Sequence, residues 1–241
     1  SKNIKKNKIE NFFIFYPSIR YYLVAKLSGI KNIYTYPLFK KKNLHLVNTA
    51  KKFVEKNLNI KNCPTDTNLY IGEEDKKKAL EKIYKNKKNI IIGAGSSGPT
   101  QKWGTHNFVN LIKLIKKKKD CHFFILCGQN ESSIADDIIK ELGDENCTSL
   151  SDKTLSEIIP LISVCDLYVG NDSFGHHVAS LCSRPSIIIL LDSPRAYSDW
   201  SKYQNRIVSL DTTLDKINHG SYTSPNVVSV DQVFNKVLNF I

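Results

Sequence analysis

Apolar residues recur along this chain in blocks whose spacing changes between that of strands and that of helices. Runs rich in Ile, Phe, Val and Tyr predict strands at residues 11–17, 32–37, 89–92, 122–128, 166–170 and 185–192. The intervening patterns predict helices at residues 18–29, 44–58, 73–86, 105–117, 131–142, 154–165, 175–182 and 230–241. From residue 89 onward strands and helices alternate, which is typical of an α/β fold with a doubly wound parallel sheet.

The alternation is complete only in the C-terminal part of the chain. Residues 87–241 contain enough predicted strands for a full sheet. Residues 1–86 also alternate between strands and helices, but with too few strands for a full sheet. We therefore expect a complete C-terminal domain over residues 87–241 and a partial N-terminal domain over residues 1–86. The chain contains no Met and begins with Ser1, so we also expect that part of the N-terminal domain precedes it.

Lysine gives the chain a basic balance, with a formal net charge of +12 and a pI of about 9.3. A basic surface attracts an anionic membrane or a nucleic acid. Because the lysines are scattered and no RNA-binding signature is present, we expect no nucleic-acid partner. The six cysteines form no C-x-x-C pair, and no apolar run approaches the roughly 20 residues of a membrane span. These features predict a cytoplasmic protein, with peripheral membrane contact as an option.

The segment GAGSSGPTQKWG, residues 93–104, is the first candidate ligand site. Its glycines let backbone N–H groups approach an anion, Ser96 and Ser97 add hydroxyl donors, and Lys102 adds a positive charge. The segment is no Walker A loop, because G-x-x-x-x-G-K-[ST] is absent. The segment is either a flexible turn or a phosphate-binding loop. We favour the phosphate-binding loop, because a second segment suited to an anion follows later in the chain.

The segment GNDSFGHH, residues 170–177, is the second candidate site, at the end of another predicted strand. Ser173 and the amides that begin the next helix can donate to a phosphate oxygen. Asp172 would repel a phosphate, so we expect it to orient the loop, cap the helix or accept from a sugar hydroxyl. His177 lies where it could donate to a diphosphate. His176 points about 100° away around the helix, and we interpret it as packed or solvated.

Two other kinds of chemistry fit these residues less well. Adjacent histidines on one helix do not easily bind one ion, and no H-x-x-x-H or Cys partner accompanies them, so we expect no metal. Ser173 lacks a G-x-S-x-G elbow, which argues against a Ser-His-Asp hydrolase. We expect no cofactor.

From about Phe12 to its end, the chain resembles the family-9 glycosyltransferases, the ADP-heptose:lipopolysaccharide heptosyltransferases. The segment GNDSFGHHVAS is similar to that family's G-N-D-[ST]-G-x-x-H-x-A pattern without a gap. The segments GAGSSGPTQKWG, FFILCGQNE and TLSEIIPLISVCDLYVGND resemble the family's pre-helix loop, Gly-rich strand end and preceding helix–strand unit. The resemblance implies the GT-B fold of two facing Rossmann-like domains.

The resemblance also implies transfer of heptose from ADP-heptose to a lipopolysaccharide core acceptor, an anionic lipid-linked glycan, at the inner face of the cytoplasmic membrane. It implies single displacement, in which a carboxylate deprotonates the acceptor and cationic groups and amides stabilise the departing ADP. It implies that Glu131 accepts from the ribose hydroxyls, and the alternative is that Glu131 is an ordinary acid in the first turn of a helix. It implies that Arg20 meets the anionic groups of the acceptor, and the alternative is an exposed surface arginine. The implied nucleotide-sugar-binding residues are Ser96, Ser97, Lys102, Glu131, Asp172, Ser173 and His177.

Three departures from the family pattern keep other functions open. Phe174 stands at the family's glycine, Gln101 stands where the family's lysine is usual, and Lys102 follows it one residue later. The family's general base is an Asp near the start of its N-terminal domain, which we expect to lie outside this chain. The alternatives are a relative that uses another sugar nucleotide or acceptor, and a nucleotide-binding module without catalysis.

Overall fold

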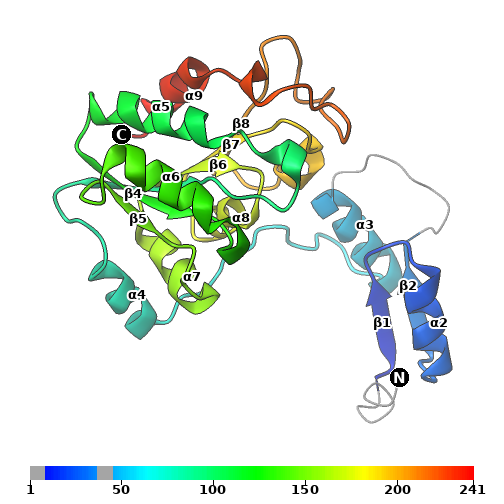
Figure 1. The fold of residues 1–241 in the computed structure, drawn as a ribbon. Coiled ribbons are helices and arrows are strands. Elements are labelled where there is room, and N and C mark those ends of the chain that lie inside the picture. Colours follow the sequence, from blue (N-terminus) through cyan, green and yellow to red (C-terminus); the bar gives the residue numbers. More distant parts are fainter. Residues whose placement is uncertain (1–8, 37–45) are drawn as a thin grey trace. The chain divides into compact units, whose positions relative to one another are not determined.

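The computed structural model describes residues 9–36 and 46–241. The chain divides into two compact units, Ser1–Thr65 and Asp66–Ile241. Each unit is built from parallel strands with helices between them (Figure 1). The α/β class that the sequence predicts is therefore confirmed.

The first unit contains a strand–helix–strand element. Strand β1 (Asn11–Ile14) pairs in parallel with β2 (Asn32–Thr35), and helix α2 (Ile19–Leu27) connects them. The hydroxyl of Ser18 accepts from a backbone N–H in the first turn of α2. Gly29 follows the end of α2 with φ +78°, a left-handed conformation that glycine adopts readily and that often terminates helices.

Helix α3 (Leu46–Leu58) completes the described part of the first unit. The ring of Phe53 on α3 lies edge-on to Phe13, Phe15 and Tyr36, with ring centroids 4.8–6.0 Å apart. This aromatic cluster holds α3 against the strand pair. The expected end of the second strand at residue 37 and the expected start of this helix at residue 44 lie outside the described residues.

The second unit is built on a six-stranded parallel sheet with the order β5-β4-β3-β6-β7-β8. Its strands are β3 (Lys88–Gly93), β4 (Cys121–Leu126), β5 (Cys147–Ser149), β6 (Leu167–Asn171), β7 (Ser186–Ile189) and β8 (Gln204–Ile207). Its helices are α4 (Glu73–Leu80), α5 (Thr105–Lys116), α6 (Ser132–Leu142), α7 (Leu155–Val164), α8 (Phe174–Leu181) and α9 (Val230–Val237). Short 3₁₀ segments are η1 (Pro99–Gln101), η2 (Gln129–Glu131), η3 (Arg195–Tyr197) and η4 (Pro225–Val227).

Helices cover both faces of this sheet. Ile90 and Ile92 of β3 pack in one buried cluster with α5, α6 and α9, whereas Ile91 packs in a second cluster with α4, α7 and α8 (Figure 1). Successive residues of a strand point to opposite faces, so a strand buried on both sides reads as the continuous apolar run seen here. The doubly wound sheet predicted from the alternation is confirmed.

The structure departs from the expected elements at the two edges of the sheet. Strands β5 and β8 each pair with a single neighbour, and neither was predicted from the sequence. β5 has three residues, and β8 reads Gln-Asn-Arg-Ile, so neither shows the apolar run of a central strand. An edge strand needs less apolar surface because one of its sides is not covered by another strand.

The two compact units divide between Thr65 and Asp66, whereas the expected domains divide at residue 86. The charged helix α4 was assigned to the N-terminal domain, but it belongs to the second unit. Ala79 of α4 is buried in a cluster with Ile158 and Leu161 of α7. Among the described residues, no helix has both the length and the apolar character needed to cross a bilayer.

Candidate nucleotide-sugar site

A cavity of about 530 Å³ opens at the carboxyl ends of β3, β4 and β6. The chain runs from β3 to β4 on one side and later adds β6 on the other side of β3, so this edge is the topological switch point of the sheet. Ligands of open parallel sheets bind at such points. The residues that line the cavity are Gly95, Ser96, Ser97, Leu126, Cys127, Gly128, Gln129, Glu131, Ser151, Asp152, Lys153, Thr154, Leu155, Ile158, Ser173, Phe174 and Gly175.

The loop after β3 lies tightly against the end of β4. The backbone N–H groups of Ala94 and Gly95 both donate to the carbonyl of Leu126. A Cβ atom at Gly95 would lie 2.6 Å from the Glu131 carboxylate and 2.8 Å from the Cα of Cys127, so no side chain fits there. This close approach presents Ser96 and Ser97 to the cavity.

Asn171, at the end of β6, joins the loop after β3 to the start of α5. Its Oδ1 accepts from the Trp103 backbone N–H at 2.9 Å, and its Nδ2 donates to the Ala94 carbonyl at 2.7 Å. Asn171 is fully buried and both ends of its amide are satisfied. Asn171 matches the N of the G-N-D pattern, but that pattern does not show that its amide joins two segments from other parts of the chain.

Glu131, which lines the cavity, forms an ion pair with Lys102, with 2.5 Å between Nζ and Oε1. The Glu131 carboxylate also accepts from the backbone N–H groups of Ser96 and Gly128, at 3.3 Å each. Burial alone would raise the pKa of Glu131. The hydrogen bonds from Lys102, Gly128 and Ser96, together with the Lys102 charge, outweigh burial, so this pKa lies below its usual value. Glu131 therefore stays ionised and holds the loops after β3 and β4 together.

Asp172 and His176 form the second buried polar pair, one helical turn apart at the start of α8. His176 Nε2 lies 2.7 Å from Asp172 Oδ1, and the His176 side chain is fully buried. Burial alone would raise the pKa of Asp172, but its hydrogen bond to His176, that ring's charge and a hydrogen bond from Ser193 lower it. Asp172 thus connects the loop after β6 to the first turn of α8.

Ser173 lines the cavity and its hydroxyl lies 3.2 Å from the Tyr168 hydroxyl. Tyr168 donates its proton to the carbonyl of Asn171 at 3.0 Å, so Ser173 is the donor in the contact between the two hydroxyls. Tyr168 is almost fully buried beneath the cavity, and burial raises its pKa. Ser173 is therefore held by a neutral phenol.

His177 faces the indole of Trp200. The two rings stack with centroids 5.9 Å apart, and the indole Nε1–H points to His177 Nδ1 at 3.3 Å. Burial and the neighbouring His176 lower the pKa of His177 to about 4, against a smaller opposing effect of Asp172. His177 is thus neutral at physiological pH, and it is not among the residues that line the cavity.

The structure brings together four of the expected residues on the cavity wall: Ser96, Ser97, Glu131 and Ser173. Lys102 and Asp172 are not lining residues, but they are bonded to Glu131 and His176 respectively. Arg20 is exposed on α2 in the first unit. No site role was expected for Gln101, which bonds to Ser96, for Ser193, which bonds to Gln101, or for Gln204, which faces His176.

One group of residues has the donor atoms for a metal ion. Ligand atoms of Asp172, His176 and His177 lie within 4.8 Å of one another. Both ring nitrogens of His176 have protein partners, Asp172 and Gln204. Nδ1 of His177 faces Trp200. Binding an ion through His176 would require one of its hydrogen bonds to break.

Comparison with known proteins shows the family of this chain. Residues 30–219 match the family model described as glycosyltransferase family 9 (heptosyltransferase). The chain belongs to glycosyltransferase family 9. It is 31% identical over 156 residues to lipopolysaccharide heptosyltransferase 1 of Campylobacter coli, covering 62% of this chain and 45% of that protein.

Two solved structures of family relatives share the fold. That of E. coli ADP-heptose lipopolysaccharide heptosyltransferase II has a TM-score of 0.73 and 18% identity, covering 99% of this chain and 78% of that one. E. coli heptosyltransferase WaaC with ADP has a TM-score of 0.71 and 12% identity, covering 100% and 77%. The expected GT-B fold of this family is thereby confirmed. The chain spans less than two thirds of the length of the curated relatives that it matches.

Proposed function

We propose that this family-9 glycosyltransferase binds ADP-heptose and transfers its heptose to a lipopolysaccharide core acceptor by single displacement. One observation carries the proposal: a single cavity at the switch point of the sheet is lined by apolar side chains, which we call the apolar end, and by polar and charged ones, which we call the polar end. A nucleotide has the same division, with a flat base at one end and a charged diphosphate at the other.

The apolar end suits the base. Leu126, Leu155, Ile158 and Phe174 line it, and Leu155 and Phe174 leave 59% and 42% of their surface exposed. Exposed apolar side chains inside a cavity gain free energy when a ligand removes them from water. An aromatic ring also stacks on a nucleobase, which contributes about 1–3 kcal/mol per base.

The polar end suits the ribose and the diphosphate. The ionised Glu131 carboxylate can accept from ribose hydroxyls. Ser97 and the first amides of α8 can donate to phosphate oxygens, whereas Ser96 and Ser173, whose hydroxyl protons go to Gln101 and Tyr168, can accept from sugar hydroxyls. Lys102 has three N–H donors and uses one for Glu131, so it can reach a phosphate without leaving that carboxylate.

His177 and Asp172 keep supporting roles in this proposal. Nδ1 of His177 accepts from Trp200, so a neutral ring carries its proton on Nε2 and can donate it to the diphosphate. Asp172 shapes the helix start. Arg20 would meet anionic groups of the acceptor, and the net charge of +12 favours contact with an anionic membrane.

The proposal is tested by binding and by turnover, measured separately. Calorimetry should show that ADP binds more tightly than UDP or GDP, and a Glu131→Gln variant should bind ADP about tenfold more weakly. ADP-heptose incubated with the full-length protein and a lipopolysaccharide acceptor should then release ADP. Binding without acceptor-dependent release would identify a nucleotide-binding module. Tighter binding of UDP or GDP would identify another sugar nucleotide.

A further inference from the structure

One buried side chain, that of Asn171, holds both ends of the loop that follows β3. Its Nδ2 donates to the carbonyl of Ala94 at 2.7 Å, and its Oδ1 accepts from the backbone N–H of Trp103 at 2.9 Å. Asn171 is the last residue of β6 and is fully buried. The loop that it closes, residues 94–103, carries three residues of the proposed ligand site: Ser96, Ser97 and Lys102.

The two points that Asn171 joins are themselves fixed to the body of the unit. The N–H of Ala94 donates to the carbonyl of Leu126 at 3.0 Å, at the end of β4. Trp103 is fully buried, and its indole Nε1–H donates to the carbonyl of Val228 at 2.7 Å. The carbonyl of Asn171 accepts from the Tyr168 hydroxyl at 3.0 Å. The amide therefore spans two anchored points from an anchored backbone.

Glycines bring β3 and β6 close together just before this loop. Gly93 and Gly170 are partners in the register of the two strands. A Cβ atom at Gly170 would lie 2.5 Å from the Cα of Gly93, so the strands could not approach in this way with a side chain there. Because Asn171 follows Gly170 directly, this approach brings its amide within reach of the residue after Gly93.

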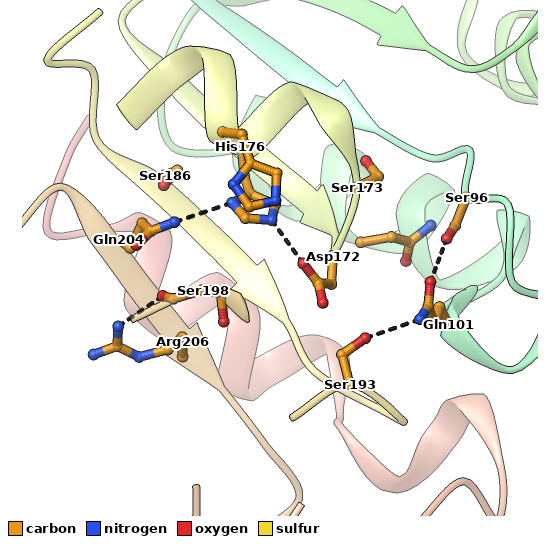
Figure 2. A network of polar contacts seen from close by, with 12 residues as sticks. Ser96, Gln101, Asp172, Ser173, His176, Ser186, Ser193, Ser198, Gln204 and Arg206 are labelled. Atoms are coloured by element: carbon orange, nitrogen blue, oxygen red, sulfur yellow. Dashed lines mark hydrogen bonds and ion pairs between the residues drawn. The ribbon is translucent and has the colours of Figure 1, made fainter. Parts of the chain in front are cut away.

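The middle of the loop has hydrogen bonds of its own. The Ser96 hydroxyl donates to Oε1 of Gln101, and the amide nitrogen of Gln101 donates to the Ser193 hydroxyl, at 3.0 Å each (Figure 2). These bonds shape the loop between its ends. Lys102 directly precedes Trp103, so the bond from Asn171 to Trp103 determines where the Lys102 side chain begins.

We propose that Asn171 is a positioning residue for the diphosphate. By holding both ends of the loop, its amide places Lys102 and Ser97 before the nucleotide binds. A loop that is ordered in advance loses less conformational freedom on binding than a free one. Asn171 does not itself line the cavity. The inference rests on the proposed function, since this placement matters only if the two side chains meet a phosphate.

Calorimetric titration tests the proposal. Asn171→Ala removes both hydrogen bonds and should weaken ADP binding about tenfold, because the ligand must then order the loop. Pyrophosphate, which has no base or ribose, should lose affinity by the same factor. Unchanged affinity for both ligands would overturn the inference and leave the proposed function standing. If the unaltered protein binds no ADP, the proposed function itself fails.

Asn89 offers the matched control, because it is another buried asparagine whose amide holds a loop. Its Oδ1 accepts from the N–H of Tyr84 at 2.9 Å, and its Nδ2 donates to the carbonyls of Tyr84 and Lys87 at 3.0 Å each. It lies near the start of β3, at the opposite end of the strand from the cavity. Asn89→Ala should lower the urea midpoint as Asn171→Ala does, but leave ADP affinity unchanged. An equal loss of ADP affinity in both variants would show a general loss of stability and would overturn the inference.

Hydrogen exchange in the ligand-free protein gives a readout that does not depend on the proposed function. The amide of Trp103 donates to Asn171, so it should exchange slowly in the unaltered protein and in Asn89→Ala. It should exchange faster in Asn171→Ala. Exchange that is equally slow in all three proteins would show that the loop keeps its ends without Asn171, and would overturn the inference.

Asn171→Asp is the variant closest in shape, and it tests the same idea if Asn171→Ala does not fold. An ionised carboxylate keeps an acceptor for Trp103 but cannot donate to the carbonyl of Ala94, whereas a protonated carboxyl can make both bonds. Burial raises the pKa of a carboxyl. Protection of the amides in residues 95–103, relative to the unaltered protein at the same pH, should therefore be reduced at about pH 8 and recover towards about pH 5. Full protection at both pH values would show that the bond to Ala94 does not hold the loop, and would overturn the inference.

Discussion

The two ends of the cavity are built in opposite ways. At the polar end, Ser96, Lys102 and Glu131 already have partners within the protein. At the apolar end, Leu155 and Phe174 leave large parts of their surface exposed. Buried polar groups without partners are costly, so their geometry must be set before binding, whereas apolar surface gains only when a ligand covers it. We therefore expect the polar end to set the pose and the apolar end to add affinity.

The largest effect is expected from Lys102→Ala at the polar end. The change removes a cation from the phosphate site and leaves the Glu131 carboxylate close to the diphosphate without its partner. Two losses, of a charged hydrogen bond and of charge compensation, should weaken ADP binding about 100-fold in calorimetry.

The matched control for Lys102→Ala is Lys113→Ala. Lys113 pairs with Glu141 at 3.3 Å, but both side chains are about half exposed and neither lines the cavity. Exposed pairs contribute little, so this variant should bind ADP normally. If the two lysine variants bind ADP equally well, the polar end does not hold the diphosphate.

A smaller effect is expected from Phe174→Ala at the apolar end. Loss of the aromatic ring should weaken ADP binding about tenfold, because stacking on a base contributes about 1–3 kcal/mol. Affinity for pyrophosphate, which has no base, should stay the same. The free energy of unfolding should change little, since the ring is already 42% exposed.

Leu210→Ala serves as the control for Phe174→Ala, since Leu210 is 82% exposed and does not line the cavity. It should bind both ligands normally. If Phe174→Ala weakens pyrophosphate as much as ADP, the ring acts on the phosphate geometry and not on the base. That outcome would show that the apolar end does not act on the base separately from the polar end.

The sequence predicts several residues of the cavity wall, and the structure explains why it did not predict the partners of the two histidines. Strand ends followed by small polar residues indicated Ser96, Ser97 and Ser173, because parallel strands present their carboxyl ends on one edge. The sequence favoured His177 over His176 for the ligand, because neighbours on a helix point about 100° apart, but the local pattern does not say which partners either ring meets, and neither ring lines the cavity.

The partners that distinguish these two histidines come from distant parts of the chain. Gln204, which faces His176, begins the edge strand β8, and Trp200, which faces His177, precedes it. That strand was not predicted, because its sequence is polar. Gln101 was noted only as a departure from a family pattern, and its bond to Ser193 depends on a loop 92 residues later.

The smallest effect is expected for the protonation of His177 and its influence on the free energy of unfolding. Partners keep Glu131 ionised, whereas burial keeps His177 neutral, with its pKa lowered to about 4. An unfolded chain protonates its histidines near pH 6.5, so between pH 6.5 and 4 the unfolded state binds more protons at this position. The free energy of unfolding should therefore fall as pH falls through this window, and stay level above it.

His177→Asn should remove its share of this pH dependence while keeping an acceptor for Trp200. Its slope, measured by urea unfolding from pH 7 to 4.5, should be lower by at most about 1.4 kcal/mol per pH unit. His122 is the comparison, because burial also lowers its pKa to about 4, and it lies away from the cavity. His122→Asn should lower the slope similarly without changing ADP affinity, whereas His177→Asn should weaken ADP binding as well. Equal slopes in the unaltered protein and His177→Asn would show that burial does not hold His177 neutral, and that Trp200 covers a ring still free to take up a proton.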